Sequence, residues 1–131
     1  MALGNRFAKR VFLFAGVYGV FVVLPQYSLE ARIARDFPPA ITHPEYFYGF
    51  IGVALAWQVA FLLIAKDVQR YRLVMLPAVL EKVTFGLAAV LLYANARVAG
   101  STVIGGIIDL VFAVLFAAAF RATRGEDGSR H

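Results

Sequence analysis

Glutamate and lysine stand side by side, as Glu81 and Lys82, near the middle of the apolar segment 73–94, LVMLPAVLEKVTFGLAAVLLYA. This segment is long and apolar enough to cross a bilayer as a helix. A charged side chain at that depth costs several kcal/mol unless it is paired or reaches water. The pair therefore marks either a functional site or a packed polar network.

Other polar side chains occur at a comparable depth in the remaining apolar segments. They are Tyr18, Gln58 and Asp109, in the segments 7–25, 46–65 and 102–120 respectively. At a helical rise of 1.5 Å per residue, all of these side chains lie roughly 10 to 16 Å from the end of the segment assigned below to the cytoplasm. We therefore predict one polar layer near mid-membrane, to which every segment contributes: Tyr18, Gln58, Glu81, Lys82 and Asp109.

The pairing within this layer follows in part from helix geometry. Glu81 and Lys82 leave the helix about 100° apart and do not naturally face each other. We expect Lys82 to pair with Asp109 across a helix interface and Glu81 to face Gln58 or Tyr18. An arrangement with Glu81 unpaired, or with Lys82 bent toward it, stays open. Two carboxylates and one ammonium leave an excess negative charge, so we expect one carboxyl to be protonated part of the time.

The composition is that of a membrane protein. Of the 131 residues, 61% are hydrophobic and 16% are charged, whereas soluble domains have about 25% charged residues. The absence of cysteine excludes disulfides, thiolate metal sites and cysteine nucleophiles, and two histidines argue against a metal or haem site,. We expect no cofactor. The net charge of +5 comes from basic residues that flank apolar segments, which is a topology signal and does not indicate nucleic-acid binding,.

These segments predict an all-α fold, a four-helix transmembrane bundle. It forms one domain over residues 1–120, with helices at about 7–25, 46–65, 73–94 and 102–120 and a flexible cytoplasmic tail at 121–131. Most lysines and arginines outside the spans precede the first helix, lie in the turn 66–72 or follow the last helix. The positive-inside rule then places both termini in the cytoplasm and the longest loop, between helices 1 and 2, outside. We expect a multi-pass protein of the inner (plasma) membrane.

The first span also has features of a signal peptide. Basic residues precede a short apolar run, Val11 to Leu24,. No small-x-small cleavage site follows Pro25, so we favour an uncleaved helix. Pro77, near the start of the third span, predicts either a kink or a late helix start.

The long loop, 26–45, has a sequence character of its own. Ser28 is placed to cap a short helix at the membrane surface, and Thr42 and Glu45 have the spacing of a capping box that opens the second span,. If the chain were an enzyme, His43 and Glu45 would be the loop's candidate acid and base, although capping already accounts for Glu45. We name no catalytic residue.

Small residues recur at helical spacing in two spans and suit close helix contact. They are Gly49, Gly52, Ala56 and Ala60 in one span, and Gly105, Asp109, Ala113 and Ala117 in the other. Either stripe could support a homodimer or contact with a membrane partner subunit.

Several functions fit the predicted layer, which could also serve only to fix helix register. The first is binding of a small amphipathic or lipid-like ligand, with Glu81 as polar anchor and aromatic walls from Tyr18, Trp57, Phe85 and Phe112,. The alternatives are a proton-linked small-molecule transporter and a membrane-embedded isomerase-type enzyme. The chain resembles small multidrug transporters in size and span count only, since their essential glutamate lies in the first span and Lys82 would repel a cation. Emopamil-binding and sigma-2-receptor proteins form comparable short bundles with buried acids.

Residues 41–82 carry a further resemblance. The stretches ITHPEYFYGFIGVALAWQ and DVQRYRLVMLPAVLEK resemble small, uncharacterised four-span inner-membrane proteins of bacteria, loosely of the DoxX-like kind. This resemblance implies a bacterial membrane bundle and brings no activity or functional residues with it.

Overall fold

The computed structural model describes residues 2–125, and over that range the chain is helical with no strand. Its elements are α1 (Leu3–Val23), η1 (Leu24–Ser28), α2 (Glu30–Asp36), α3 (Pro44–Lys66), η2 (Arg72–Val74), α4 (Met75–Ala94) and α5 (Gly100–Ala122). Four helices are long and apolar enough to cross a membrane. A helix satisfies its own backbone hydrogen bonds, which an apolar medium requires. The predicted all-α, four-helix transmembrane bundle is confirmed.

The helix ends differ from the predicted ones by a few residues. α1 begins at Leu3 and so includes the basic residues that precede the apolar run; their long side chains can reach the interface from a helix. α5 continues through Ala122, and Thr123 after it is fully buried. The start of the predicted tail therefore belongs to the packed bundle, and its residues 126–131 lie outside the described part of the chain.

The short helix in the long loop is present, but its predicted cap is not. Leu29 occupies the N-cap position of α2 because Ser28 is still the last residue of η1. α3 likewise has His43 at its N-cap, without a side-chain cap hydrogen bond, because Pro44 takes the first helical position,. The predicted capping roles of Ser28 and Thr42 are therefore wrong.

α2 is held to the bundle by a polar contact. The Tyr48 hydroxyl of α3 donates a hydrogen bond of 2.6 Å to the Glu30 carboxylate of α2, and the ring of Tyr48 stacks on that of Tyr27 at 6.2 Å.

Pro77 lies in the first turn of α4, where a missing N–H costs little,. Of the two predicted alternatives, a kink or a late helix start, the late start is confirmed, because α4 begins at Met75 after the short helix η2.

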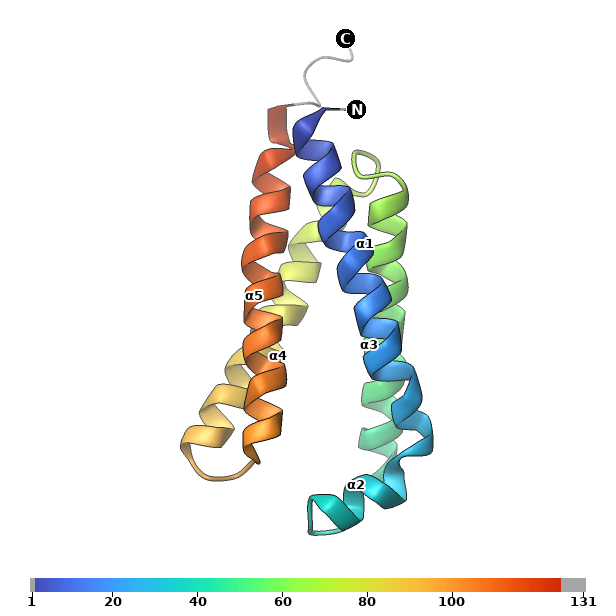
Figure 1. Ribbon diagram of the computed structural model, residues 1–131, viewed down its shortest axis with the longest axis vertical. Coiled ribbons are helices and arrows are strands. Elements are labelled where there is room, and N and C mark those ends of the chain that lie inside the picture. Colours follow the sequence, from blue (N-terminus) through green and yellow to red (C-terminus); the bar gives the residue numbers. More distant parts are fainter. Residues whose placement is uncertain (1, 126–131) are drawn as a thin grey trace.

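The helices pack as two pairs, α1 with α3 and α4 with α5 (Figure 1). α1 also packs on α5, whereas α3 and α4 have little contact. Figure 1 shows the pairs meeting at the end that holds the start of α1 and the end of α5, and diverging toward the end that holds α2. We call these the termini end and the α2 end. The two pairs are thus close together at the termini end and spread apart at the α2 end.

Glycines set the close approach within each pair. A Cβ added at Gly16 of α1 would lie 2.7 Å from the Leu62 side chain of α3, and one at Gly19 would overlap the Gln58 side chain. In the other pair, a Cβ at Gly86 of α4 would lie 2.9 Å from the carbonyl oxygen of Gly106. The predicted stripe of α3 is not used in this way, since Gly49 and Ala56 are exposed.

The larger cluster of buried apolar side chains lies in the half of the bundle nearer the termini end, and a smaller one, of Val23, Ile51 and Ala54, lies toward the α2 end. Phe12, Phe61 and Phe116 are fully buried and come from α1, α3 and α5. The rings of Phe12 and Phe116 stack at 4.2 Å, and Phe61 meets Phe116 edge-on at 5.0 Å. These rings fill the space between three helices on the side of the polar layer that faces the termini end.

The turn between α3 and α4 fastens the termini end. Arg72 donates hydrogen bonds of 3.0 Å to the Thr123 hydroxyl and 2.6 Å to the Phe120 carbonyl, and its guanidinium lies 3.8 Å from the Phe120 ring centre. A cation bonded to the last carbonyls of α5 also complements the helix dipole. Gln69 of the same turn donates to the Asn5 side chain of α1 at 2.8 Å.

We expect Arg72→Ala to lower the free energy of unfolding by about 1–2 kcal/mol, because it removes charge-assisted hydrogen bonds and the contact with Phe120. Arg70→Ala is the matched control, since within residues 2–125 the exposed Arg70 side chain contacts only the ring of its neighbour Tyr71. Thermal unfolding of both variants in detergent would measure the difference. Equal midpoints for the two variants would show that the turn does not fasten the bundle.

Candidate functional site

Every residue of the predicted polar layer lines a single cavity between the two helix pairs. The cavity has a volume of ≈ 290 Å³, and we call it the polar cavity. Its layer residues are Tyr18 from α1, Gln58 from α3, Glu81 and Lys82 from α4, and Asp109 from α5. Its remaining walls come from Gly19, Val22, Val23, Gln26, Phe50, Ala54, Phe85, Ser101, Thr102 and Gly105. The structure thus brings together side chains from all four spans.

Lys82 and Asp109 form the ion pair that the sequence predicts. The Nζ atom of Lys82 lies 3.3 Å from Oδ1 of Asp109. It also lies 3.7 Å from Oε2 of Glu81, because the long lysine stem bends back toward the neighbouring side chain. The Lys82 side chain is only 8% exposed. One buried ammonium therefore lies between two carboxylates.

Two acceptor atoms of the layer have no hydrogen-bond partner within the described chain. The Gln58 amide donates to the Ala54 carbonyl of its own helix at 2.9 Å, which leaves its Oε1 buried against Gly19. Oε2 of Glu81 is also buried without a hydrogen bond. The expected contact of Glu81 with Gln58 or Tyr18 is therefore not made, because the Gln58 amide turns onto α3.

Aromatic rings pack against Lys82 at one wall of the polar cavity. Nζ of Lys82 lies 5.3 Å from the ring centre of Phe61 and 5.6 Å from that of Phe112, within the range of cation–π attraction,. Tyr18 packs against Phe112 at 5.7 Å. The Lys82 ammonium is thus held by the rings of Phe61 and Phe112 and by the Asp109 carboxylate. Of the aromatic residues proposed as walls, Tyr18 and Phe85 line the cavity directly.

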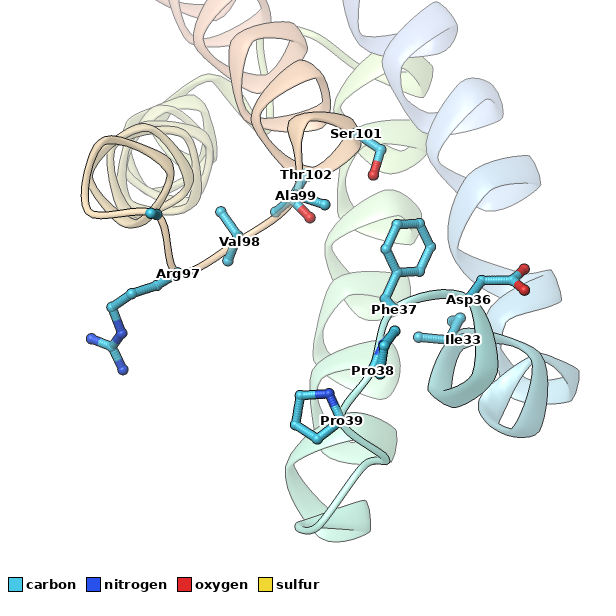
Figure 2. Close-up of a pocket in the computed structure, with 11 residues that line it drawn as sticks. Ile33, Asp36, Phe37, Pro38, Pro39, Arg97, Val98, Ala99, Ser101 and Thr102 are labelled. Carbon is cyan, nitrogen blue, oxygen red and sulfur yellow. The ribbon is translucent and has the colours of Figure 1, made fainter.

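The polar cavity adjoins a wider opening at the α2 end, which we call the mouth. It has a volume of ≈ 690 Å³ and lies between residues 33–39 of the long loop and residues 96–102 of the α4–α5 turn. Ser101 and Thr102 line both the mouth and the polar cavity. Figure 2 shows the Phe37 ring directed toward these residues, while the Arg97 side chain points away. The lining of the mouth is therefore mixed: apolar side chains such as Ile33 and Phe37 lie opposite the hydroxyl-bearing Ser101 and Thr102.

A second opening faces the side of the bundle, between α3 and α4. This side groove has a volume of ≈ 300 Å³ and is lined by Phe50, Val53, Ala54, Trp57, Glu81, Thr84 and Phe85. Glu81, Ala54 and the stacked rings of Phe50 and Phe85, 5.9 Å apart, border both the groove and the polar cavity. The groove exists because α3 and α4 diverge. Glu81 is thus the charged residue shared by the cavity and the apolar flank of the bundle.

The loop candidates lie elsewhere. Nδ1 of His43 is 3.4 Å from Oε1 of Glu45, and both side chains are about two-thirds exposed, 66% and 64%. Neither lines the polar cavity, the mouth or the side groove. No cluster of three or more histidine, cysteine or acidic side chains able to hold a metal occurs in residues 2–125.

The sequence analysis named Phe85 as a wall but missed the mouth and Phe50, whose ring stacks on that of Phe85 and borders both the groove and the cavity. Ser101 and Thr102 stand beside Gly100 at the start of an otherwise apolar span, which was the available signal. Phe50 gave none, because an aromatic residue in a span is usually simple packing.

The fold and the site define the class of protein: a small multi-pass membrane protein with four apolar helices and a polar cavity among them. No protein family model, curated protein or solved structure matches the chain significantly.

Proposed function

We propose that this protein binds an amphipathic or lipid-like ligand in the polar cavity, as a resident of the bacterial inner (plasma) membrane. The polar part of the ligand lies beside Glu81, and its apolar part extends into the side groove or the mouth. One observation carries this proposal: polar side chains from four separate spans converge on one cavity that adjoins both an apolar groove and an opening at the α2 end.

The size of the site supports this function. A cavity of ≈ 290 Å³ is close to the lower limit of roughly 300 Å³ that is usual for small-molecule sites,. It accommodates a head group and a short length of chain. The side groove adds ≈ 300 Å³ lined by Phe50, Trp57 and Phe85, which suits an apolar tail.

The unsatisfied atoms argue against a purely structural layer. Polar groups that serve only to fix helix register are favourable when each finds a partner within the bundle. Here the Lys82–Asp109 pair fulfils that role, whereas Glu81 has only the longer ion pair with Lys82, at 3.7 Å, and Oε1 of Gln58 accepts no hydrogen bond within residues 2–125. A ligand or water in the cavity would complete the contacts of the Glu81 carboxylate, whose side chain is 20% exposed.

Native mass spectrometry of protein extracted gently from its own membranes tests the proposal. We expect the wild-type chain to carry a small molecule or lipid that is absent from Glu81→Gln. Glu45→Gln is the matched control, because it makes the same chemical change at an exposed position outside the cavity. A bare wild-type protein, or a ligand retained equally by all three proteins, would refute the proposal.

A further inference from the structure

We propose that the polar cavity selects amphiphiles whose head group donates hydrogen bonds and carries positive charge, such as a primary ammonium, and discriminates against anionic head groups. This inference rests on the proposed function and specifies its ligand. It follows from hydrogen bonds, from charge and from the position of Lys82.

The hydrogen-bond inventory of the cavity favours a ligand that donates. Lys82 donates to Asp109, and the Gln58 amide nitrogen donates to Ala54. Oε1 of Gln58 and Oε2 of Glu81 accept no hydrogen bond within residues 2–125, but both atoms are buried and do not face the free volume of the cavity. The Glu81 side chain as a whole is 20% exposed and lines both the cavity and the side groove. A head group that meets this carboxylate must supply donors, because a carboxylate only accepts hydrogen bonds.

The charge inventory points the same way. The charged side chains that line the polar cavity are Glu81, Lys82 and Asp109, which together carry a formal charge of −1. An anionic head group would add a second negative charge in a region of low dielectric, where repulsion is strong. An ammonium head would make the site neutral.

The position of Lys82 explains why its ammonium does not repel such a ligand. Its Nζ atom lies closer to Asp109, at 3.3 Å, than to Glu81, at 3.7 Å, and it contacts the rings of Phe61 and Phe112 without lining the side groove. Glu81, in contrast, borders the side groove as well as the cavity. A ligand that enters from the groove therefore reaches the Glu81 carboxylate at the edge shared with the cavity, while the lysine charge is already neutralised by its partner.

A head-group series with a constant tail tests this inference. Dodecylamine, dodecanol and dodecanoate are titrated separately into the full chain in nanodiscs of zwitterionic lipid, and binding is followed by native mass spectrometry. In the wild-type protein we expect the amine to bind best and dodecanoate worst, with the amine favoured over dodecanoate by about tenfold or more. In Glu81→Gln the amine should lose its advantage over dodecanol, because the excess charge is gone. Glu45→Gln should behave as wild type.

The outcomes separate the two proposals. Dodecanoate binding as tightly as the amine, in a manner that depends on Glu81, would overturn the head-group assignment and leave the ligand site standing. An amine preference that survives Glu81→Gln would also overturn it, since the attraction would then arise elsewhere. No difference between wild type and Glu81→Gln for any of the three probes would overturn both proposals.

Discussion

Lys82→Met is expected to lower the free energy of unfolding by about 3–5 kcal/mol, the usual cost of removing one partner from a buried ion pair. Methionine keeps the length and the apolar stem of lysine but removes the ammonium. The carboxylates of Asp109 and Glu81, whose side chains are 17% and 20% exposed, would then face each other without a cation. Thermal unfolding in detergent, monitored as the loss of monodisperse protein with temperature, measures the effect.

A double-mutant cycle separates the pair from simple loss of packing. In the Lys82→Met background, Asp109→Asn should restore much of the lost stability, since it removes the more closely placed of the two carboxylates. In the wild-type background the same change should cost less, because Lys82 keeps Glu81 at 3.7 Å. If Lys82→Met and the double variant were equally unstable, the loss would come from packing against Phe61 and Phe112, and the charge argument would be wrong.

The four spans could be predicted because their signal is simple: long apolar segments separated by charged turns. The predicted positions of the helix ends were less accurate where a helix continues through charged residues. Arg6 lies inside α1 because a basic side chain near a helix end can reach the membrane surface without ending the helix,. At α3 the proline ring fixed the start at Pro44, and this local effect outweighed the capping pattern of Thr42.

The polar layer could be predicted because depth along a span follows directly from residue count. Lys82 and Asp109 fall at similar depths, and an ammonium in that layer needs a carboxylate. The orientation of Gln58 could not be predicted, because it depends on a hydrogen bond to its own helix and on space that Gly19 of another helix provides. The mouth and the side groove depend on the angle between helix pairs, which no local pattern encodes.

Gly106→Ala is expected to destabilise the protein by about 1–3 kcal/mol through overpacking at the α4–α5 contact. A Cβ at Gly106 would lie 2.5 Å from the Cβ of Ala89 and 3.3 Å from the Gly86 carbonyl oxygen. The first contact is far too short for two carbon atoms, and neither a Cβ nor a carbonyl oxygen can turn aside because the backbone fixes both, so the two helices must separate. Gly105→Ala is the matched control on the same helix, since a Cβ there meets no atom within 4 Å.

The two neighbouring glycines should also differ in what they do to the ligand site. Separating α4 from α5 draws Lys82 away from Asp109, so Gly106→Ala should weaken ligand retention as well as stability. Gly105 lines the polar cavity, so alanine there adds a methyl group to the site while leaving the helix contact intact. We therefore expect Gly105→Ala to keep or slightly raise the unfolding temperature, because alanine favours helix, and to change only ligand retention. Equal loss of stability in both variants would show that α4 and α5 do not meet through Gly106, and that another contact sets the spacing of the Lys82–Asp109 pair.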